Sequence, residues 1–106
     1  MKKIVLFAFN GESMCFVHVL LNALDMHSRG YDVKLVIEGS ATKLVKELDG
    51  PDAAFGNLYK EVKEKGLVDC VCEACSQKTG SLTAAEDQGL RLCGELKGHP
   101  SIARYA

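Results

Sequence analysis

Apolar runs alternate along this chain with segments of helical periodicity. Three runs are rich in β-branched or other apolar residues and end at turn residues, and a fourth is shorter. They are Lys3 to Phe9, Asp32 to Ile37, Leu67 to Cys72 and Leu90 to Cys93. Such runs are typical of strands buried in a parallel sheet. The pattern therefore predicts four strands in this order.

The segments between these runs have the spacing of helices. A polar stripe with steps of three and four residues predicts a long, largely buried helix from Ser13, its N-cap, to Arg29. Helical spacing continues from Ala41 to Leu48, is broken at Gly50-Pro51, and resumes until Gly66. The capping-box spacing of Thr83 and Glu86 predicts a short helix over 84–88.

Strands that alternate with helices imply right-handed crossovers and a parallel sheet with helices on its faces. We therefore predict an α/β fold: a three-layer α/β/α sandwich with a mainly parallel sheet of four to five strands. The length of 106 residues suits one domain over 1–106.

Composition narrows the classes of partner. The formal net charge is -1 and there is no basic tract, so we expect no nucleic-acid partner. The longest apolar runs, Ile4 to Phe9 and Phe16 to Leu21, are far shorter than the roughly 20 residues of a membrane span. Five cysteines, an odd number, argue against a disulfide framework. We expect a cytoplasmic protein whose thiols are reduced.

The carboxyl ends of parallel strands are where such folds place their functional sites. Three predicted loops lie there: Asn10 to Cys15, Glu38 to Ser40, and Cys72 to Gly80. The last holds most of the Cys70-x-Cys72-x-x-Cys75 cluster. Thiol or persulfide chemistry is therefore the chemistry that we expect from this chain.

The three clustered cysteines have different expected roles. Cys70 lies within a strand, and buried cysteine is commonly a small core residue. Cys75 stands at the start of a helical turn near Lys78, an environment that favours the nucleophilic thiolate. Cys72 and Cys75 have the spacing of a redox pair, although a thioredoxin-like helix inside the motif is not evident. We expect Cys75 and Cys72 to be the reactive residues.

A metal site is the alternative to thiol chemistry. Cys70, Cys72 and Cys75 could occupy three corners of a zinc tetrahedron, with Cys15, Cys93 or a histidine as the fourth ligand. The chain has no second Cys-x-x-Cys pair to strengthen this interpretation.

Other candidates have weaker support. Asn10 and Gly11 precede a predicted helix and could bind a small substrate anion through backbone N–H groups. Cys15 could approach Cys75 if the first and third strands are neighbours. His18 lies on the polar stripe of the long helix, and His27 and His99 have less to recommend them.

The ordered pattern resembles the DsrE/DsrF-like family of small α/β proteins associated with sulfur relay. The resemblance rests on Lys3-Ile4-Val5-Leu6-Phe7, the helix after Asn10-Gly11, the Ala74-Cys75 turn with Gly80 and Leu82-Thr83, and the closing Gly98-His99-Pro100-Ser101-Ile102. It implies a homo-oligomer, commonly a trimer or hexamer, with a persulfide-carrying cysteine after the third strand, which corresponds to Cys75. It also implies a final strand beyond Ala106.

The expected function is therefore sulfur handling, with Cys75 exchanging persulfide sulfur with donor and acceptor proteins and with no resident cofactor. A non-catalytic oligomeric binding or regulatory module remains the alternative from another class. Many apolar residues on the long helix, including Phe16 and Leu21, exceed what a small sheet can cover. This excess also predicts a homo-oligomer.

Overall fold

Four parallel strands form the centre of the fold. The computed structural model describes residues 1–50 and 52–106. The strands are β1 (Lys3–Ala8), β2 (Asp32–Ile37), β3 (Val68–Cys72) and β4 (Leu92–Cys93), and they lie side by side in that order. All three pairings are parallel. The predicted α/β fold with a parallel sheet of four strands is confirmed.

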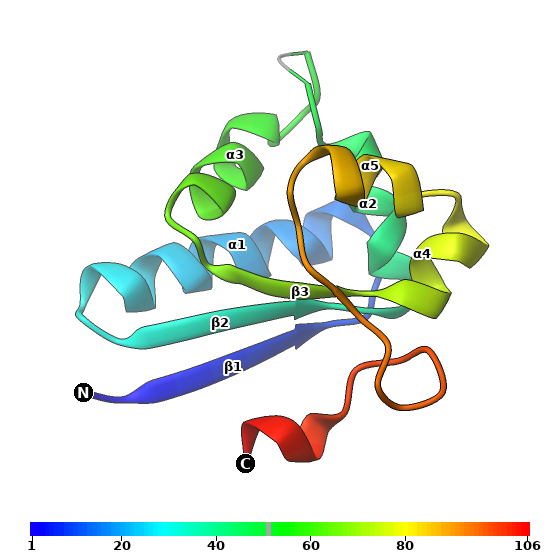
Figure 1. The fold of residues 1–106 in the computed structure, drawn as a ribbon. Helices are drawn as coiled ribbons and strands as arrows, with labels where there is room; N and C mark the ends of the chain where they lie inside the picture. The colour runs from blue at the N-terminus through cyan, green and yellow to red at the C-terminus, as the bar shows by residue number, and fades with distance from the viewer. Residues whose placement is uncertain (51) are drawn as a thin grey trace.

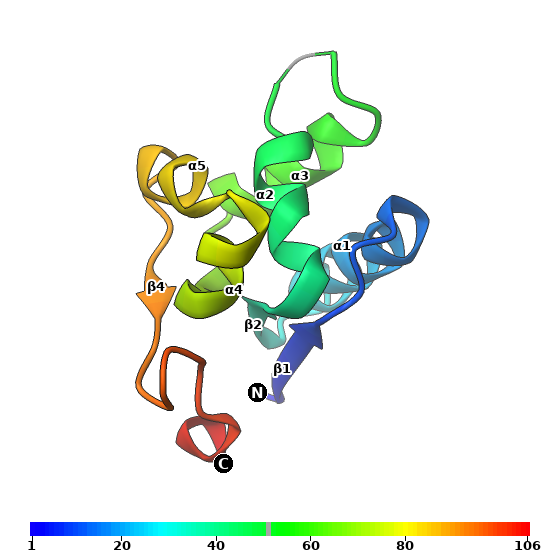
Figure 2. The same ribbon diagram turned by 90° about the vertical axis from the view of Figure 1, so that its right-hand side faces the viewer.

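The strand order determines where the helices lie. Each crossover moves the chain one strand further in the same direction, and right-handed crossovers of this kind place every helix on one face. Figures 1 and 2 show this single helical layer. Its members are α1 (Ser13–Ser28), α2 (Lys43–Glu47), α3 (Gly56–Glu64), α4 (Glu73–Thr79) and α5 (Leu82–Asp87), with the 3-10 helix η1 (Gly39–Thr42) before α2.

The opposite face of the sheet is covered by the C-terminal segment 94–106. This segment contains the 3-10 helix η2 (Ile102–Tyr105) and lies on the side of the sheet away from the α-helices (Figure 1). The ring of Tyr105 packs edge-on against Phe7 with 5.7 Å between centroids, over a small core that includes Val36. Within the described residues, the two outer layers of the sandwich are therefore unequal, with five α-helices on one side and the 3-10 helix η2 on the other.

Helix α1 follows the predicted boundaries but is less buried than expected. Only Phe16, Leu20 and Ala23 are fully buried, and they form the stripe that faces the sheet and α3. Met14 and Leu21 are exposed because nothing in the described chain packs over the outer side of this layer. The predicted N-cap is also wrong by one residue: Ser13 is the first helical residue, and Glu12 occupies the cap without a side-chain hydrogen bond.

Two further boundary predictions can be judged. The helix predicted over 84–88 exists as α5, but it begins at Leu82 after Ser81, so Thr83 lies inside the helix and forms no capping box. The predicted break at Gly50-Pro51 includes Pro51, which lies outside the described residues. Helices α2 and α3 flank that position, in agreement with a broken helical segment.

One pair of cysteines corrects the expectation that all thiols are free. Cys70 on β3 and Cys93 on β4 form a disulfide in the small core beneath Tyr105. The two strands are neighbours, which brings the Cα atoms within 5.8 Å although the residues are 23 apart in sequence. The burial predicted for Cys70 is confirmed. Cys15, Cys72 and Cys75 remain free thiols.

The described helices were also compared with the length and hydropathy that a bilayer requires. Across 1–50 and 52–106, none combines enough length with enough apolar character to cross a membrane.

Two loops at the carboxyl edge of the sheet touch at Gly11. Its N–H donates a hydrogen bond to Ser40 Oγ at 2.9 Å, and Ser40 Oγ in turn donates to the carbonyl of Phe9 at 3.1 Å. A Cβ at Gly11 would lie 2.6 Å from the backbone oxygen of Ser40. Glycine is therefore required for this close approach, which joins the ends of β1 and β2.

We expect Gly11→Ala to lower the free energy of unfolding by about 1–3 kcal/mol, because backbone atoms must move apart to admit the methyl group. Gly94→Ala is the matched control. The nearest atom to its Cβ is the Glu73 carboxylate oxygen at 3.3 Å, the end of a flexible side chain. Urea unfolding of both variants tests the idea, and equal losses would contradict it.

Candidate functional site

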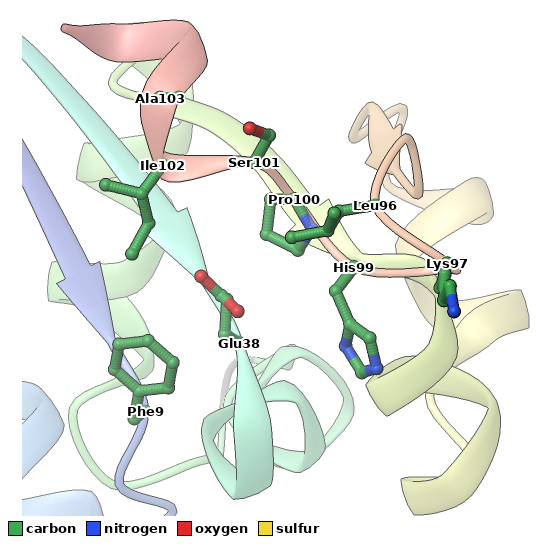
Figure 3. A pocket seen from close by; sticks show the side chains of 9 residues that line it. All are labelled: Phe9, Glu38, Leu96, Lys97, His99, Pro100, Ser101, Ile102 and Ala103. Atoms are coloured by element: carbon green, nitrogen blue, oxygen red, sulfur yellow. The ribbon is translucent and has the colours of Figure 1, made fainter.

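Residues from all four strand ends meet at the carboxyl edge of the sheet. Phe9 follows β1, Glu38 follows β2, Cys72 ends β3, and the segment after β4 returns with His99. This is the edge at which open α/β sheets carry their sites. Figure 3 shows Phe9, Glu38 and His99 lining one pocket beneath the C-terminal segment.

Cys72 is both the last residue of β3 and the N-cap of α4. Its Sγ accepts a hydrogen bond from the Cys75 N–H at 3.5 Å, which satisfies one of the free donors in the first helical turn. The helix ends at Thr79, and Gly80 caps it in the left-handed conformation with a φ of 74°. The motif was expected to lie in a turn, but a helix begins within it, as in a thioredoxin-like redox pair.

Hydroxyl groups hold α4 against η1. Thr42 Oγ1 and Thr79 Oγ1 are 2.8 Å apart, and both lie within hydrogen-bond distance of the Cys75 carbonyl oxygen, at 3.2 and 3.1 Å. Thr42 is fully buried, so these bonds form away from solvent. The backbone at Cys75 is therefore fixed from both sides.

His99 reaches the site through a tight hairpin. Leu96 and His99 exchange two backbone hydrogen bonds around Lys97-Gly98, and both turn residues have positive φ, 52° and 93°. Such a turn favours glycine at its second central position. The Ala74 N–H then donates to the Gly98 carbonyl at 2.8 Å. These contacts place His99 directly against the start of α4.

Cys72, Cys75 and His99 form a compact triad. His99 Nδ1 is 3.2 Å from Cys72 Sγ and 3.7 Å from Cys75 Sγ. Cys72 Sγ also lies 3.6 Å from the Gly98 carbonyl oxygen, to which it can donate. One imidazole nitrogen can therefore exchange a proton with either thiol.

The two thiols differ in environment. Cys72 is fully buried, and burial raises the pKa of its thiol to about 11, so it stays protonated near neutral pH. Cys75 is only partly buried. It lines an open cavity of about 490 Å³ together with His99, Gln77 and Lys78. Cys75 is therefore the thiol that a reactant in solution can reach.

Glu38 is a second group at this edge that sequence analysis did not single out. It is 7% exposed, and its Oε1 has no hydrogen-bond partner within 1–50 and 52–106. Burial raises the pKa of its carboxyl group, while the neighbouring His99 opposes the rise. Glu38 and His99 line a cavity of about 620 Å³ whose walls include Phe9 and Ile102 (Figure 3). His99 thus borders both cavities.

The weaker candidates do not join the triad. Cys15 is exposed and lines a different cavity, beside Phe16, because β2 separates β1 from β3. The condition under which Cys15 could approach Cys75 is therefore not met. Asn10 accepts a hydrogen bond from the Glu12 N–H at 2.8 Å, and the Gly11 N–H is bonded to Ser40. Their part in binding a substrate stays a prediction.

The predicted cysteine cluster is also rearranged. Cys70 cannot serve as a metal ligand with Cys72 and Cys75, because it is bonded to Cys93. His99 replaces it, although sequence analysis gave that histidine little weight. The signal that could have found it is Lys97-Gly98 followed by His99-Pro100: a turn that reverses the chain, and a proline that keeps the preceding residue extended.

Comparison with known proteins gives relatives without an assigned activity. No family model matches the chain, and no solved structure matches it. An uncharacterized protein of Archaeoglobus fulgidus is 46% identical over 41 residues, which are 39% of this chain and 67% of that protein. A second Archaeoglobus fulgidus protein is 62% identical over 26 residues, 24% of this chain and 70% of that protein. The chain belongs to the same family as these two proteins.

A third relative matches more of the chain. It is an uncharacterized protein of Methanocaldococcus jannaschii, 29% identical over 89 residues, which are 84% of this chain and 70% of that protein. All three relatives are described only as uncharacterized. Arguments about function therefore rest on the chemistry of the triad.

The two environments predict different reactivity toward iodoacetamide. At about pH 8 we expect Cys15 and Cys75 to be alkylated in the folded protein while Cys72 is spared, because thiolate is the reactive form. Cys72 should become reactive only as the pH approaches 11. Peptide mass spectrometry reads each site. Alkylation of Cys72 at the rate of exposed Cys15 at pH 8 would contradict this, and denatured protein should show all three alike.

Proposed function

We propose that this protein handles sulfur in the manner of the DsrE-like family, carrying sulfane sulfur as a persulfide on Cys75. The observation that supports this most is the approach of His99 Nδ1 to within 3.7 Å of a thiol that opens into a cavity. A nucleophile within reach of a base is the arrangement that thiol group transfer requires.

The loading step is redox-neutral. Cys75 loses its proton to His99 Nδ1, and the thiolate attacks the outer sulfur of a donor persulfide. A sulfur–sulfur bond forms on Cys75 while the donor's own sulfur–sulfur bond breaks. The donor leaves as a thiolate and takes up the proton. An acceptor thiolate unloads Cys75 by the same exchange.

Cys72 has a supporting role in this scheme. Its Sγ is 3.2 Å from His99 Nδ1, closer than the Sγ of Cys75, and its raised pKa keeps the thiol protonated, with the Gly98 carbonyl 3.6 Å away as the acceptor for its S–H. A buried thiol of this kind packs beside the imidazole, leaves Nδ1 free to take the Cys75 proton, and does not compete for the sulfur donor. Its position beside Cys75 also suits a resolving thiol when a mixed disulfide forms.

Intact mass after treatment with a persulfide donor tests the assignment. In a Cys15→Ser background, which removes the exposed cysteine outside the triad, we expect the mass of one added sulfur atom. Cys75→Ser in that background should add none, and Cys72→Ser should still load. His99→Ala should slow loading about 100-fold, the usual contribution of a positioned base. Loading that survives Cys75→Ser would overturn the assignment.

The non-catalytic alternative has a distinct outcome in the same experiment. A binding or regulatory module would leave Cys75 no more reactive toward the persulfide donor than Cys15, which is exposed and lies outside the triad. Comparing Cys15→Ser, which keeps Cys75, with the single variant Cys75→Ser, which keeps Cys15, therefore separates the two functions.

We infer that the protein acts as a cytoplasmic homo-oligomer, a trimer or hexamer, that meets sulfur donor and acceptor proteins. Three of the five cysteines, including both at the site, are free thiols, which suits a reducing compartment, and the Cys70–Cys93 disulfide is buried away from reductants in solution. Phe9, Leu96 and Ile102 are 51%, 57% and 60% exposed around the cavity that Glu38 lines. Apolar side chains grouped in this way commonly mark a contact surface.

A second copy of the chain is the occupant that we expect on this surface. Light scattering at micromolar concentration should give a multiple of the 11.5 kDa chain mass. Ile102→Asp should shift the mass toward one chain, because it places an unpaired charge in the contact. Lys97→Asp, on the same hairpin as Leu96 but polar already, is the control. A wild-type mass of one chain would refute the assembly.

A further inference from the structure

The triad also has the dimensions of a metal-binding site. The ligand atoms of Cys72, Cys75 and His99 all lie within 4.8 Å of one another. Zinc bound to two sulfur atoms and one nitrogen has bond lengths of about 2.3 and 2.0 Å, so the edges of its tetrahedron measure roughly 3.5–3.8 Å. The two distances from His99 Nδ1 to sulfur, 3.2 and 3.7 Å, are close to that range.

We propose that Cys72, Cys75 and His99 bind one thiophilic divalent cation, zinc in the first instance. Two thiolates and an imidazole are a ligand set that selects zinc over hard cations such as magnesium or calcium. Binding releases one proton from each thiol to solvent and changes no oxidation state. The inference goes beyond the proposed function because it assigns a metal ion to the thiols that the proposed function uses for sulfur transfer.

The backbone around the three ligands is already fixed. Cys72 and Cys75 are one helical turn apart, the short spacing typical of paired zinc thiolates. His99 is held by the hairpin and by the Ala74 to Gly98 hydrogen bond. Little conformational entropy is then lost when a cation binds, which favours affinity.

Charge near the triad also favours a cation. The buried carboxyl group of Glu38 has an oxygen without a partner in the described part of the chain, and it lines the same cavity as His99. A buried carboxylate is stabilised by a positive ion nearby. Glu38 therefore supplies negative charge beside the ligands and is expected to strengthen binding.

The fourth coordination position faces the open cavity. Cys75 and His99 line that cavity together with Gln77 and Lys78. Neither Gln77 nor Lys78 offers a preferred zinc ligand. Water is the expected fourth ligand. An open position of this kind is typical of zinc sites that exchange ligands, in contrast to closed structural sites.

Zinc and a persulfide donor would then compete for the thiolate of Cys75. A Cys75 thiolate bound to zinc is a weaker nucleophile than the free thiolate, so metal occupancy would slow sulfur loading. The competition requires no change of fold, since both states use the same side-chain positions.

Cobalt substitution tests the metal site without reference to sulfur transfer. The full chain is prepared anaerobically with its Cys70–Cys93 disulfide intact, as shown by three free thiols after denaturation. We expect one equivalent of Co²⁺ to give a thiolate charge-transfer band and the visible bands of tetrahedral cobalt. Zn²⁺ should displace it one for one. Wild-type protein without this spectrum would overturn the proposal.

Variants assign the ligands. Cys75→Ser, Cys72→Ser and His99→Ala should each weaken binding by more than about 100-fold, the upper loss from outer-sphere changes alone. Serine retains the helix cap at position 72. Cys15→Ser is the matched control and should bind like wild type. His99→Cys should retain cobalt with a stronger charge-transfer band, which a purely structural histidine would not produce. Equal binding by Cys15→Ser and Cys75→Ser would contradict the assignment.

A second readout separates this proposal from sulfur transfer. One equivalent of Zn²⁺ should protect Cys75 from iodoacetamide while Cys15 remains reactive in the same molecules. Persulfide loading is measured in metal-free protein, so either proposal can fail while the other stands. Protection of neither cysteine, or of both equally, would count against the triad as a zinc site.

Discussion

One backbone hydrogen bond, from the Ala74 N–H to the Gly98 carbonyl, joins the two parts of the chain from which the site is built. It links the first turn of α4 to the hairpin after β4, and both the buried thiol and the imidazole lie beside it. A Cβ at Gly98 would lie 3.0 Å from the Ala74 Cβ, and φ there is 93°, so glycine makes the contact possible. Without this hydrogen bond, His99 would not be held beside Cys72 and Cys75.

The hairpin is free to reach this position because the strand order places all α-helices on one face. The other face is then open to the C-terminal segment, which crosses it from β4 toward β1 and ends in η2 (Figure 2). Tyr105 anchors the far end through Phe7 and a hydrogen bond to Asp69. The segment that covers this face of the sheet is therefore also the segment that brings His99 to the site.

Much of the fold could be predicted from the sequence because strand burial leaves a direct pattern. Lys3 to Phe9 and Asp32 to Ile37 were predicted within one residue of β1 and β2. Helix α4 could not be predicted in this way. It has seven residues and only Ser76 is buried, so no apolar period marks it. Its N-cap is a cysteine, which is not among the side chains that usually signal a helix start.

The site was only half predictable for a different reason. Cys72 and Cys75 were recognised because their spacing and their position after a strand are local features. His99 and Glu38 join them through tertiary contacts that depend on a hairpin and on strand order. The Cys70–Cys93 disulfide is of the same kind, since only the neighbouring positions of β3 and β4 bring the sulfur atoms together.

The thin cover over the second face has a consequence for the dynamics of the molecule. Segment 94–106 is held there by a small core and by the ion pair of Arg104 with Asp69 on β3, whereas the helical face has the main core. Regions with few buried contacts open locally at a lower free energy than the whole domain unfolds. Detachment of this segment would withdraw His99 and leave the thiols on an otherwise folded protein. Segment 94–106 with His99 thus forms a cooperative unit that is less stable than the scaffold that carries the two thiols.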